Sequence, residues 1–215
     1  MTGTLTGPVP RGWPGWFVDL SEHNALKRNH WQYLEDNGCE AVMLRAANGT
    51  EPDTAFHDHA GWAIRHHMRV GAYLFLRPAT VAPIRAQVDT LLAAVRSLPV
   101  PVWHIAVDVE NGKGRPPWTA ADLPGRCTRQ AVWLLYTATR ARPWVYTYRS
   151  FWQQWLAGER MLDPYPLWAA RYDKTYTPER LTAEFGRKPI AWQVGGGPVD
   201  GLKGSPVIDK NVRLP

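Results

Sequence analysis

The feature that most constrains the fold is an alternation along the chain of short apolar runs with longer segments of helical periodicity. The apolar runs, each of strand length, occupy residues 16–20, 41–46, 70–76, 102–109, 144–148, 166–170, 190–194 and 207–212. Helical patterns over 26–37 and 56–67, a segment opened by Pro83, and a pattern over 122–140 separate the first five runs. Strands that alternate with helices indicate parallel βαβ units.

No glycine-rich phosphate-binding loop follows a predicted strand, so about eight strands favour a closed barrel over a doubly wound nucleotide-binding sheet. We therefore predict an α/β fold, a modified and compact TIM-like β/α barrel. A full barrel takes about 250 residues, whereas this chain has 215. Prolines crowd the chain after Ala157. We therefore expect few helices in the C-terminal part, where mainly loops should join the last strands.

Composition predicts one folded unit, because 45% of the residues are hydrophobic, enough for a single core. We predict an N-terminal extension over residues 1–15 and a single β/α-barrel domain over 16–215. The sequence shows no secretory signal pattern and no apolar run of the roughly 18 residues that a membrane-spanning helix needs. We expect a monomer without a membrane partner.

The charge balance favours polyanionic partners, since Lys and Arg total 25 against 19 Asp and Glu, a net charge of +6. Nucleic acid is a poor candidate, because the basic residues are scattered and no nucleic-acid-binding motif is present. Metal chemistry is also disfavoured, because neither His57 with His59 nor His66 with His67 converges on one helix face. We expect neither a metal nor another cofactor.

Two carboxylates mark the sharpest candidate site. Strand side chains alternate, so Asp108 and Glu110 share one face at the carboxyl end of the run 102–109, where a β/α barrel places its reactive groups. Asp19 and Asp209 lie in the first and last predicted strands, which are neighbours in a closed barrel. Four acids at one rim predict acid/base chemistry on a neutral polar substrate; the alternative for each acid is a helix cap or a salt bridge.

Aromatic residues are numerous, with 12 Trp and 8 Tyr. Several fall at predicted strand ends or loops, where flat rings can stack on sugars and phenols can bond to hydroxyls. The candidates at this stage are Tyr73, Trp118, Tyr146, Tyr148, Trp168, Tyr172 and Trp192. Each one taken singly is more readily explained as part of the core than as a ligand contact.

The ordered motifs of the chain resemble those of glycoside hydrolase family 25, the Chalaropsis-type lysozymes common among phage endolysins. They are Phe-Val-Asp-Leu-Ser (17–21), Leu-Arg-Ala-Ala-Asn-Gly-Thr (44–50), Val-Gly-Ala-Tyr-Leu-Phe (70–75), Ala-Val-Asp-Val-Glu (106–110), Tyr-Pro-Leu-Trp-Ala-Ala-Arg-Tyr (165–172), Ala-Trp-Gln (191–193) and Val-Ile-Asp-Lys-Asn (207–211). The chain departs from the family pattern at Leu74, where His is usual, and at 22–24.

The resemblance implies a peptidoglycan muramidase, a glycosidase that cleaves the β-1,4 bond between N-acetylmuramic acid and N-acetylglucosamine. It matches Glu110 to the proton donor, Asp108 to its partner carboxylate, and Asp19 and Asp209 to two flanking acids. The substrate contacts expected on this basis are Arg45, Tyr73, Tyr146, Trp168, Tyr172 and Trp192.

Two questions stay open at the level of the sequence. Asp108 could act as a nucleophile or could orient the 2-acetamido group of the substrate. The barrel could also serve as a non-catalytic glycan-binding or virion module, although the presence of all four acids argues against this. The expected partners are peptidoglycan glycan strands and anionic wall polymers, and the expected location is the host cytoplasm until release to the wall.

Overall fold

The computed structural model describes residues 15–112, 116–172, 176–198 and 207–214. The predicted extension over 1–15 therefore lies outside the described residues except for Gly15. The strands are β1 (Trp16–Leu20), β2 (Cys39–Asn48), β3 (Glu51–Pro52), β4 (Arg69–Phe75), β5 (Ile105–Asp108), β6 (Trp144–Tyr148), β7 (Leu167–Ala170), β8 (Ala191–Pro198) and β9 (Val207–Arg213).

The strands form one sheet in the order β1-β9-β8-β7-β6-β5-β4-β2-β3, and a further pairing of β1 with β2 closes eight of them into a barrel. The short strand β3 stands outside the barrel as a hairpin on β2. The structure thus confirms the predicted compact β/α barrel.

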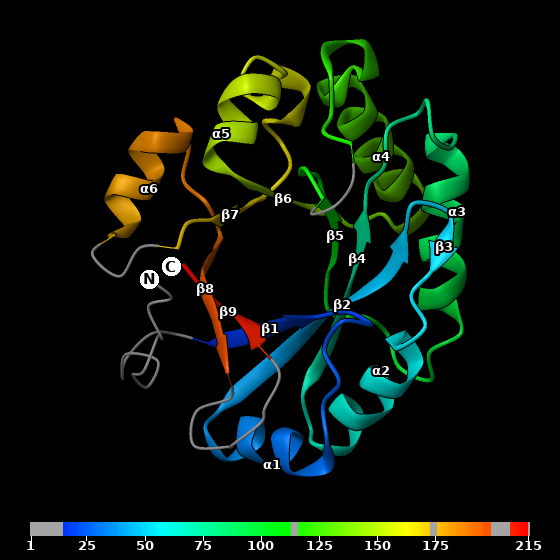
Figure 1. The fold of residues 1–215 in the computed structure, drawn as a ribbon, viewed down its shortest axis with the longest axis vertical. Coiled ribbons are helices and arrows are strands. Elements are labelled where there is room, and N and C mark those ends of the chain that lie inside the picture. Colours follow the sequence, from blue (N-terminus) through cyan, green and yellow to red (C-terminus); the bar gives the residue numbers. More distant parts are fainter. Residues whose placement is uncertain (1–14, 113–115, 173–175, 199–206, 215) are drawn as a thin grey trace.

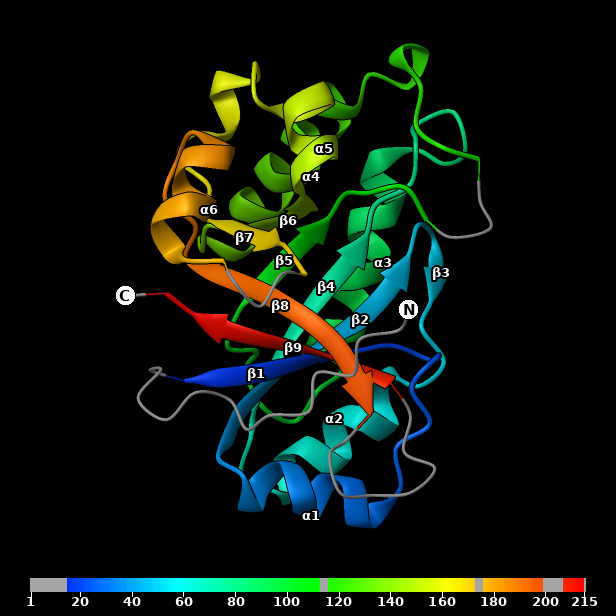
Figure 2. The ribbon, with the colours of Figure 1, turned by 60° about the vertical axis from the view of Figure 1, so that its left-hand side comes forward.

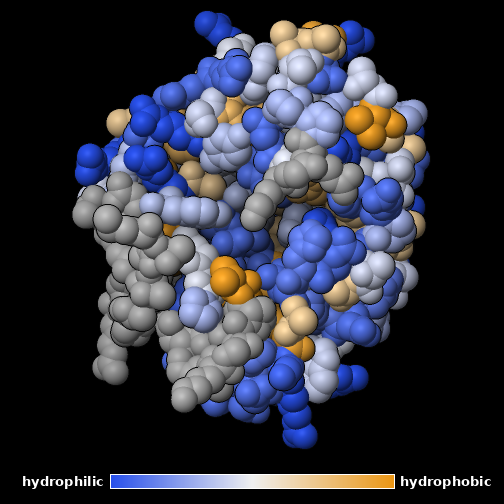
Figure 3. All heavy atoms as spheres, in the orientation of Figure 1, coloured by the Kyte–Doolittle hydropathy of each residue, from blue (hydrophilic) through white to orange (hydrophobic). Residues whose placement is uncertain are grey.

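Helices surround the barrel in chain order (Figure 1). They are α1 (Arg28–Asp36), α2 (Phe56–Arg65), α3 (Ile84–Arg96), α4 (Pro124–Thr139), α5 (Arg149–Phe151), which continues as a π-helical turn (Trp152–Leu156), and α6 (Pro178–Phe185), with 3-10 turns at Ala120–Asp122 and Arg160–Leu162. Their apolar faces bury the outward residues of the strands, such as Val42 and Val107. On the face seen in Figure 3, hydrophilic residues predominate and hydrophobic ones are scattered.

The inward residues form a second, separate core that fills one end of the barrel. Phe17, Met43, Ala106, Trp144 and Trp168 belong to it. A side chain at Gly71, which pairs with Met43 across β4 and β2, would meet the Met43 sulfur. This end of the barrel is therefore closed by packing.

The last strand is where the barrel departs from a regular TIM barrel, because β9 runs antiparallel to both β1 and β8. Figure 2 shows β8 and β9 crossing the molecule in opposite directions. The reversal places the start of β9 beside the carboxyl end of β1, with Asp19 directly opposite Asp209. The predicted meeting of these two acids is confirmed, by an antiparallel route that the sequence pattern did not indicate.

The C-terminal part contains few helices, as predicted, and α6 is one of them. Prolines led us to expect mainly loops there, yet Pro178 occupies the first turn of α6, where its fixed φ is favourable. The Thr177 hydroxyl accepts a bond from the Arg180 amide at the start of this helix, and Gly186 ends it with φ +66°. The last strands are therefore joined by both helix and loop.

Candidate active site

A polar cavity of about 270 Å³ opens at the carboxyl end of the parallel strands. Its lining includes the four predicted acids together with five of the predicted substrate contacts: Asp19, Asp108, Glu110, Asp209, Arg45, Tyr73, Tyr146, Trp168 and Tyr172. Residues from distant parts of the chain therefore converge on one site, as expected for a β/α barrel.

Trp192 is the predicted contact that the structure places elsewhere. Its side chain is buried in the outer core, where its indole Nε1 donates to the Arg171 carbonyl over 2.8 Å. The neighbouring residue Gln193 points into the cavity instead, because successive strand residues face opposite sides of a sheet. Trp192 therefore supports the wall of the barrel and is not in position to contact a ligand in the cavity.

Burial and mutual repulsion perturb the pKa values of Asp108, the last residue of β5, and of Glu110, which follows the strand. Burial, followed by the charge of Asp209, raises the pKa of Glu110 from 4.5 to about 7. Burial and the charge of Glu110 raise the pKa of Asp108 well above its usual value. Asp108 Oδ1 is buried and has no hydrogen-bond partner among the residues that the structure describes. Such a site can hold a proton on a carboxyl group near neutral pH.

The two acids on β1 and β9 extend the same cluster. Burial and then the charge of Asp209 raise the pKa of Asp19, while hydrogen bonds from Asn211 and Gln193 oppose this rise. Burial also raises the pKa of Asp209. A side chain at Gly196 would meet Asp209 Oδ1 at 2.5 Å. Glycine at this position of β8 therefore makes room for the Asp209 carboxyl group.

A chain of directed hydrogen bonds holds Asp19. The hydroxyl groups of Tyr146 and Tyr172 both donate to the Gln193 carbonyl oxygen, at 2.7 and 2.6 Å. The Gln193 amide then donates to Asp19 Oδ2 over 2.8 Å. On the other side, Asn211 Nδ2 donates to the same oxygen over 2.8 Å. Asp19 therefore receives two donors, which favour its ionised form.

The Asn211 side chain is oriented in its turn by Trp168. The Trp168 indole, which can only donate, bonds to Asn211 Oδ1 over 2.8 Å, so the Asn211 amide nitrogen must face Asp19. We did not single out Gln193 or Asn211 from the sequence. Alternation along β9 from Asp209 would have placed Asn211 on the inner face, and both residues lie within motifs quoted above.

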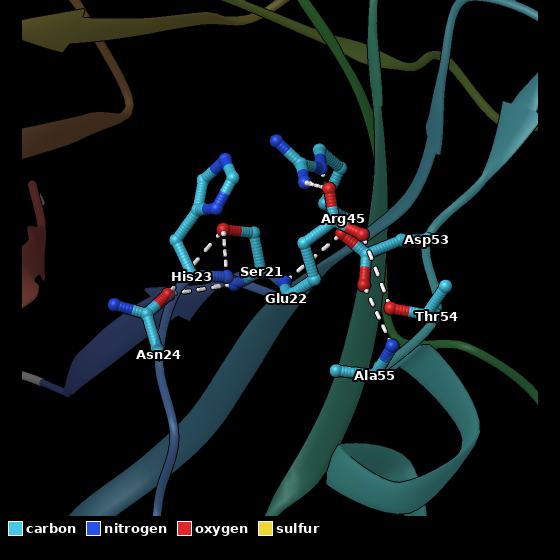
Figure 4. A network of polar contacts seen from close by, with 8 residues as sticks. All are labelled: Ser21, Glu22, His23, Asn24, Arg45, Asp53, Thr54 and Ala55. Carbon is cyan, nitrogen blue, oxygen red and sulfur yellow. Dashed lines mark hydrogen bonds and ion pairs between the residues drawn. The ribbon is translucent and has the colours of Figure 1, made fainter.

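Arg45 is held in place by two acids (Figure 4). Its Nε donates to Asp53 Oδ2 and its Nη2 to Glu22 Oε1, each over 2.7 Å. Asp53 Oδ2 also accepts from the Glu22 amide, and Asp53 Oδ1 accepts from the Ala55 amide. Both Arg45 and Asp53 are buried. The Arg45 charge, fixed at the cavity, lowers the pKa of Asp108 against the effects that raise it.

The aromatic residues of the cavity differ in exposure. Trp168 and Tyr73 are buried, at 2% and 8% exposure, whereas Tyr172 is 62% exposed. The Trp168 ring packs on Tyr146 with a centroid distance of 4.8 Å. Tyr172 therefore presents its ring at the rim, and Trp168 mainly supports the floor.

A second hollow of about 580 Å³ shares Glu110, Tyr146 and Tyr172 with the first. Its other lining residues come from β6, α5, the following π-helical turn and the end of β7: Tyr148, Arg149, Ser150, Gln153, Ala170 and Arg171. Glu110 thus borders both hollows, which gives an extended ligand room on either side of it.

The described residues contain no group of three or more His, Cys, Asp or Glu side chains arranged to hold a metal ion. Within the same part of the chain, no helix is both long and apolar enough to span a membrane. Cys39 and Cys127 are buried free thiols.

Comparison with known proteins identifies the architecture. The model of glycosyl hydrolases family 25 matches residues 18–195. A family 25 glycosyl hydrolase from Bacillus anthracis has a TM-score of 0.73 at 19% identity, covering 94% of this chain and 90% of that one. A muramidase from Acremonium alcalophilum has a TM-score of 0.70 at 21% identity, covering 94% of both chains.

A third similar structure is the modular autolysin LytC from Streptococcus pneumoniae, in complex with a synthetic peptidoglycan ligand. Its TM-score is 0.70 at 19% identity, covering 93% of this chain and 46% of that one. At such identities the structural likeness concerns the fold. No curated protein sequence matches the chain significantly.

Proposed function

The chain belongs to glycosyl hydrolases family 25, and from that premise we propose that Glu110 is the general acid with which it cleaves peptidoglycan between N-acetylmuramic acid and N-acetylglucosamine. The chain is a glycoside hydrolase of the muramidase type. The observation that carries the assignment is the position of Glu110, with a pKa of about 7, between two hollows at the barrel mouth.

In the first step Glu110 gives its proton to the glycosidic oxygen as the bond from that oxygen to the anomeric carbon breaks. General acid catalysis works best when the pKa of the acid lies near the working pH. In the second step the ionised Glu110 takes a proton from water, which attacks the anomeric carbon. The carboxyl group is thereby restored.

Asp108 is proposed to orient the 2-acetamido group of the muramic acid. Its free Oδ1 is a buried acceptor that an amide N–H of the substrate would satisfy. The acetamido oxygen then forms a bond to the anomeric carbon as the leaving oxygen departs, and the Asp108 carboxylate balances the positive charge. Water later opens this ring and returns the acetamido group.

Asp19 and Asp209 are proposed as positioning residues. The negative charge of Asp209 keeps the pKa of Glu110 high, so the proton is present when substrate binds. Asp19, held by Gln193 and Asn211, is suited to accept a hydrogen bond from water or a sugar hydroxyl. Tyr172 offers a stacking surface at the rim, where one sugar can lie on its exposed ring.

The net charge of the chain supports a proposal about its partners in the cell wall. The net charge of +6 favours attraction to anionic wall polymers. We also propose that the enzyme stays in the host cytoplasm until it reaches the wall.

The bond specificity is tested by digesting purified peptidoglycan, reducing the new ends with borohydride and identifying them by mass spectrometry. A muramidase leaves muramic acid at the reducing end, so muramitol is expected. Glucosaminitol would show cleavage of the other glycosidic bond and contradict the proposal. If no new reducing ends appear, the result would favour the non-catalytic module.

A further inference from the structure

The outward face of α4 carries an unusual stripe of cationic and aromatic side chains. Arg126, Arg129, Gln130 and Trp133 follow the helical spacing i, i+3, i+4 and i+7, opposite the buried face. Trp133 is 56% exposed. Met161, which is 61% exposed, lies in the same hollow as Trp133, and an apolar patch rimmed by polar side chains is typical of an interaction site.

A groove of about 360 Å³ runs along this stripe. The second wall of the groove consists of Met161, which is 61% exposed, and Tyr165. Gly125 lets the π-helical turn that precedes this wall pack closely on α4, because a Cβ there would lie 3.1 Å from the Trp155 carbonyl oxygen. The Arg187 guanidinium donates to the carbonyl oxygens of residues 162, 163 and 165, over 2.6 to 3.1 Å, and so fixes the wall. The groove is therefore built from anchored elements.

The charge of the groove is positive. Arg126 is exposed, and Arg129 pairs with Glu159 over 3.4 Å, which leaves room for other acceptors. Arg142 adds a further cation close enough to influence the pKa of Tyr165. Arginine forks match phosphate oxygens in pairs, and an exposed indole stacks on a sugar face.

We propose that the α4 groove is a second polysaccharide-binding site, which takes a phosphodiester-linked anionic glycopolymer of the cell wall. The inference rests on the proposed muramidase function, since that function brings the protein to the wall. Trp133 stacks on a sugar, while Arg126 and Arg129, which lie one to two turns toward the N-terminus of α4, bind phosphate groups on that side of the sugar. The groove shares no lining residue with the two hollows around Glu110. Binding there therefore holds the enzyme on the wall while the catalytic groove remains free.

The test is co-sedimentation of the full chain with Gram-positive cell walls that retain their phosphodiester polymer, and with the same walls after hydrofluoric acid has removed it. The Glu110→Gln background prevents digestion during the assay. The test variant is Arg126→Gln with Trp133→Ser, and the matched control is Arg85→Gln with Val81→Ser. Arg85 is an exposed residue of α3. Val81 precedes that helix and is 64% exposed.

The test variant should bind untreated walls about tenfold more weakly, the loss of one or two charge-assisted contacts. The control should change less than about twofold, and binding to stripped walls should be equal for all three proteins. Equal losses in test and control, or no loss in either, would overturn the proposal. Binding to anionic phospholipid vesicles is measured in parallel, and a loss seen with vesicles but not with walls would also overturn the proposal, because it would identify the groove as a membrane contact.

A separate readout keeps this result distinct from the proposed function. With Glu110 intact, the test variant should cleave a short neutral glycan at the parental rate. If neither protein cleaves the glycan while the wall-binding difference persists, the muramidase assignment fails and the α4 groove stands. If the test variant alone loses cleavage, the groove belongs to the catalytic site and the proposal is wrong.

Discussion

The Gln193 side-chain amide donates to Asp19 Oδ2 over 2.8 Å while its carbonyl oxygen accepts from two tyrosines. With its oxygen accepting from both hydroxyls, the amide presents its nitrogen to the acid. The partners of Gln193 thus determine that Asp19 meets a donor at this position. The catalytic cavity depends on this directed contact as well as on the acids themselves.

Gln193→Glu should disrupt the contact with almost no change in shape. A carboxylate in this place repels Asp19 and removes a donor to a charged group, which is commonly worth about 1.5–3 kcal/mol. We expect kcat/KM on soluble glycan to fall roughly ten- to a hundredfold. Tyr172→Phe, which leaves Tyr146 to orient Gln193, should cost less. An unchanged rate for Gln193→Glu would show that Asp19 needs no donor from β8.

The pH profile should carry the signature of Glu110. Since its pKa is about 7, the protonated acid is lost as the pH rises through that value, and kcat/KM should fall on the alkaline side. Asp209→Asn removes a charge that raises this pKa, so the alkaline limb should move to lower pH. Asp163→Asn, an exposed acid away from the cavity, should leave the limb in place. A limb that moves equally in both variants, or in neither, would contradict the role given to Asp209.

Glu110→Gln should also change stability in a pH-dependent way. The pKa of Glu110 is raised in the folded state. Its contribution to the free energy of unfolding is therefore fully present below the unfolded pKa of 4.5 and is lost as the pH rises through about 7. The amide cannot ionise, so the variant should be more stable than wild type at about pH 8, by on the order of 1–3 kcal/mol. Thermal unfolding at about pH 4 and pH 8 measures this difference. A difference that does not grow with pH would contradict the burial of Glu110.

Arg45 and Arg69 lie on neighbouring strands and offer a matched comparison of ion pairs. Arg45→Met leaves buried Asp53 without its charged partner, which should cost about 3–5 kcal/mol. Arg69 pairs with Glu40 where both side chains are nearly half exposed, so Arg69→Met should cost less than about 1 kcal/mol. Urea unfolding at neutral pH gives both values. Similar costs would show that the Arg45 cluster is not sealed from water.

Much of the barrel could be predicted from the sequence, because its strands are short, apolar and bounded by clear turn signals. The runs at 16–20 and 144–148 coincide with β1 and β6. The direction of β9 could not be predicted, since strand direction depends on the path of the preceding connection. Helix α6 was missed because prolines were interpreted as breakers, although Thr177 and Gly186 are ordinary start and stop residues.

The candidate site, like the fold, could be predicted from the sequence only in part. The four acids and five of the six substrate contacts line one cavity, because alternation along strands sorts side chains by face. Residue type, position in a predicted strand and the family resemblance together predict Trp192 as a contact, but its outward direction follows from the inward position of Gln193. The contact of Glu22 with Arg45 joins residues 23 positions apart, and no local sequence pattern indicates it.

The central claim is that Glu110 supplies the proton, and kcat for Glu110→Gln on a defined peptidoglycan fragment tests it most directly. The amide keeps the shape of the side chain but has no acidic proton to transfer, so kcat should fall about 10²–10⁴-fold. Thermal unfolding should show an intact fold, and the fragment should still bind. A folded Glu110→Gln protein that turns over at close to the wild-type rate would contradict the account.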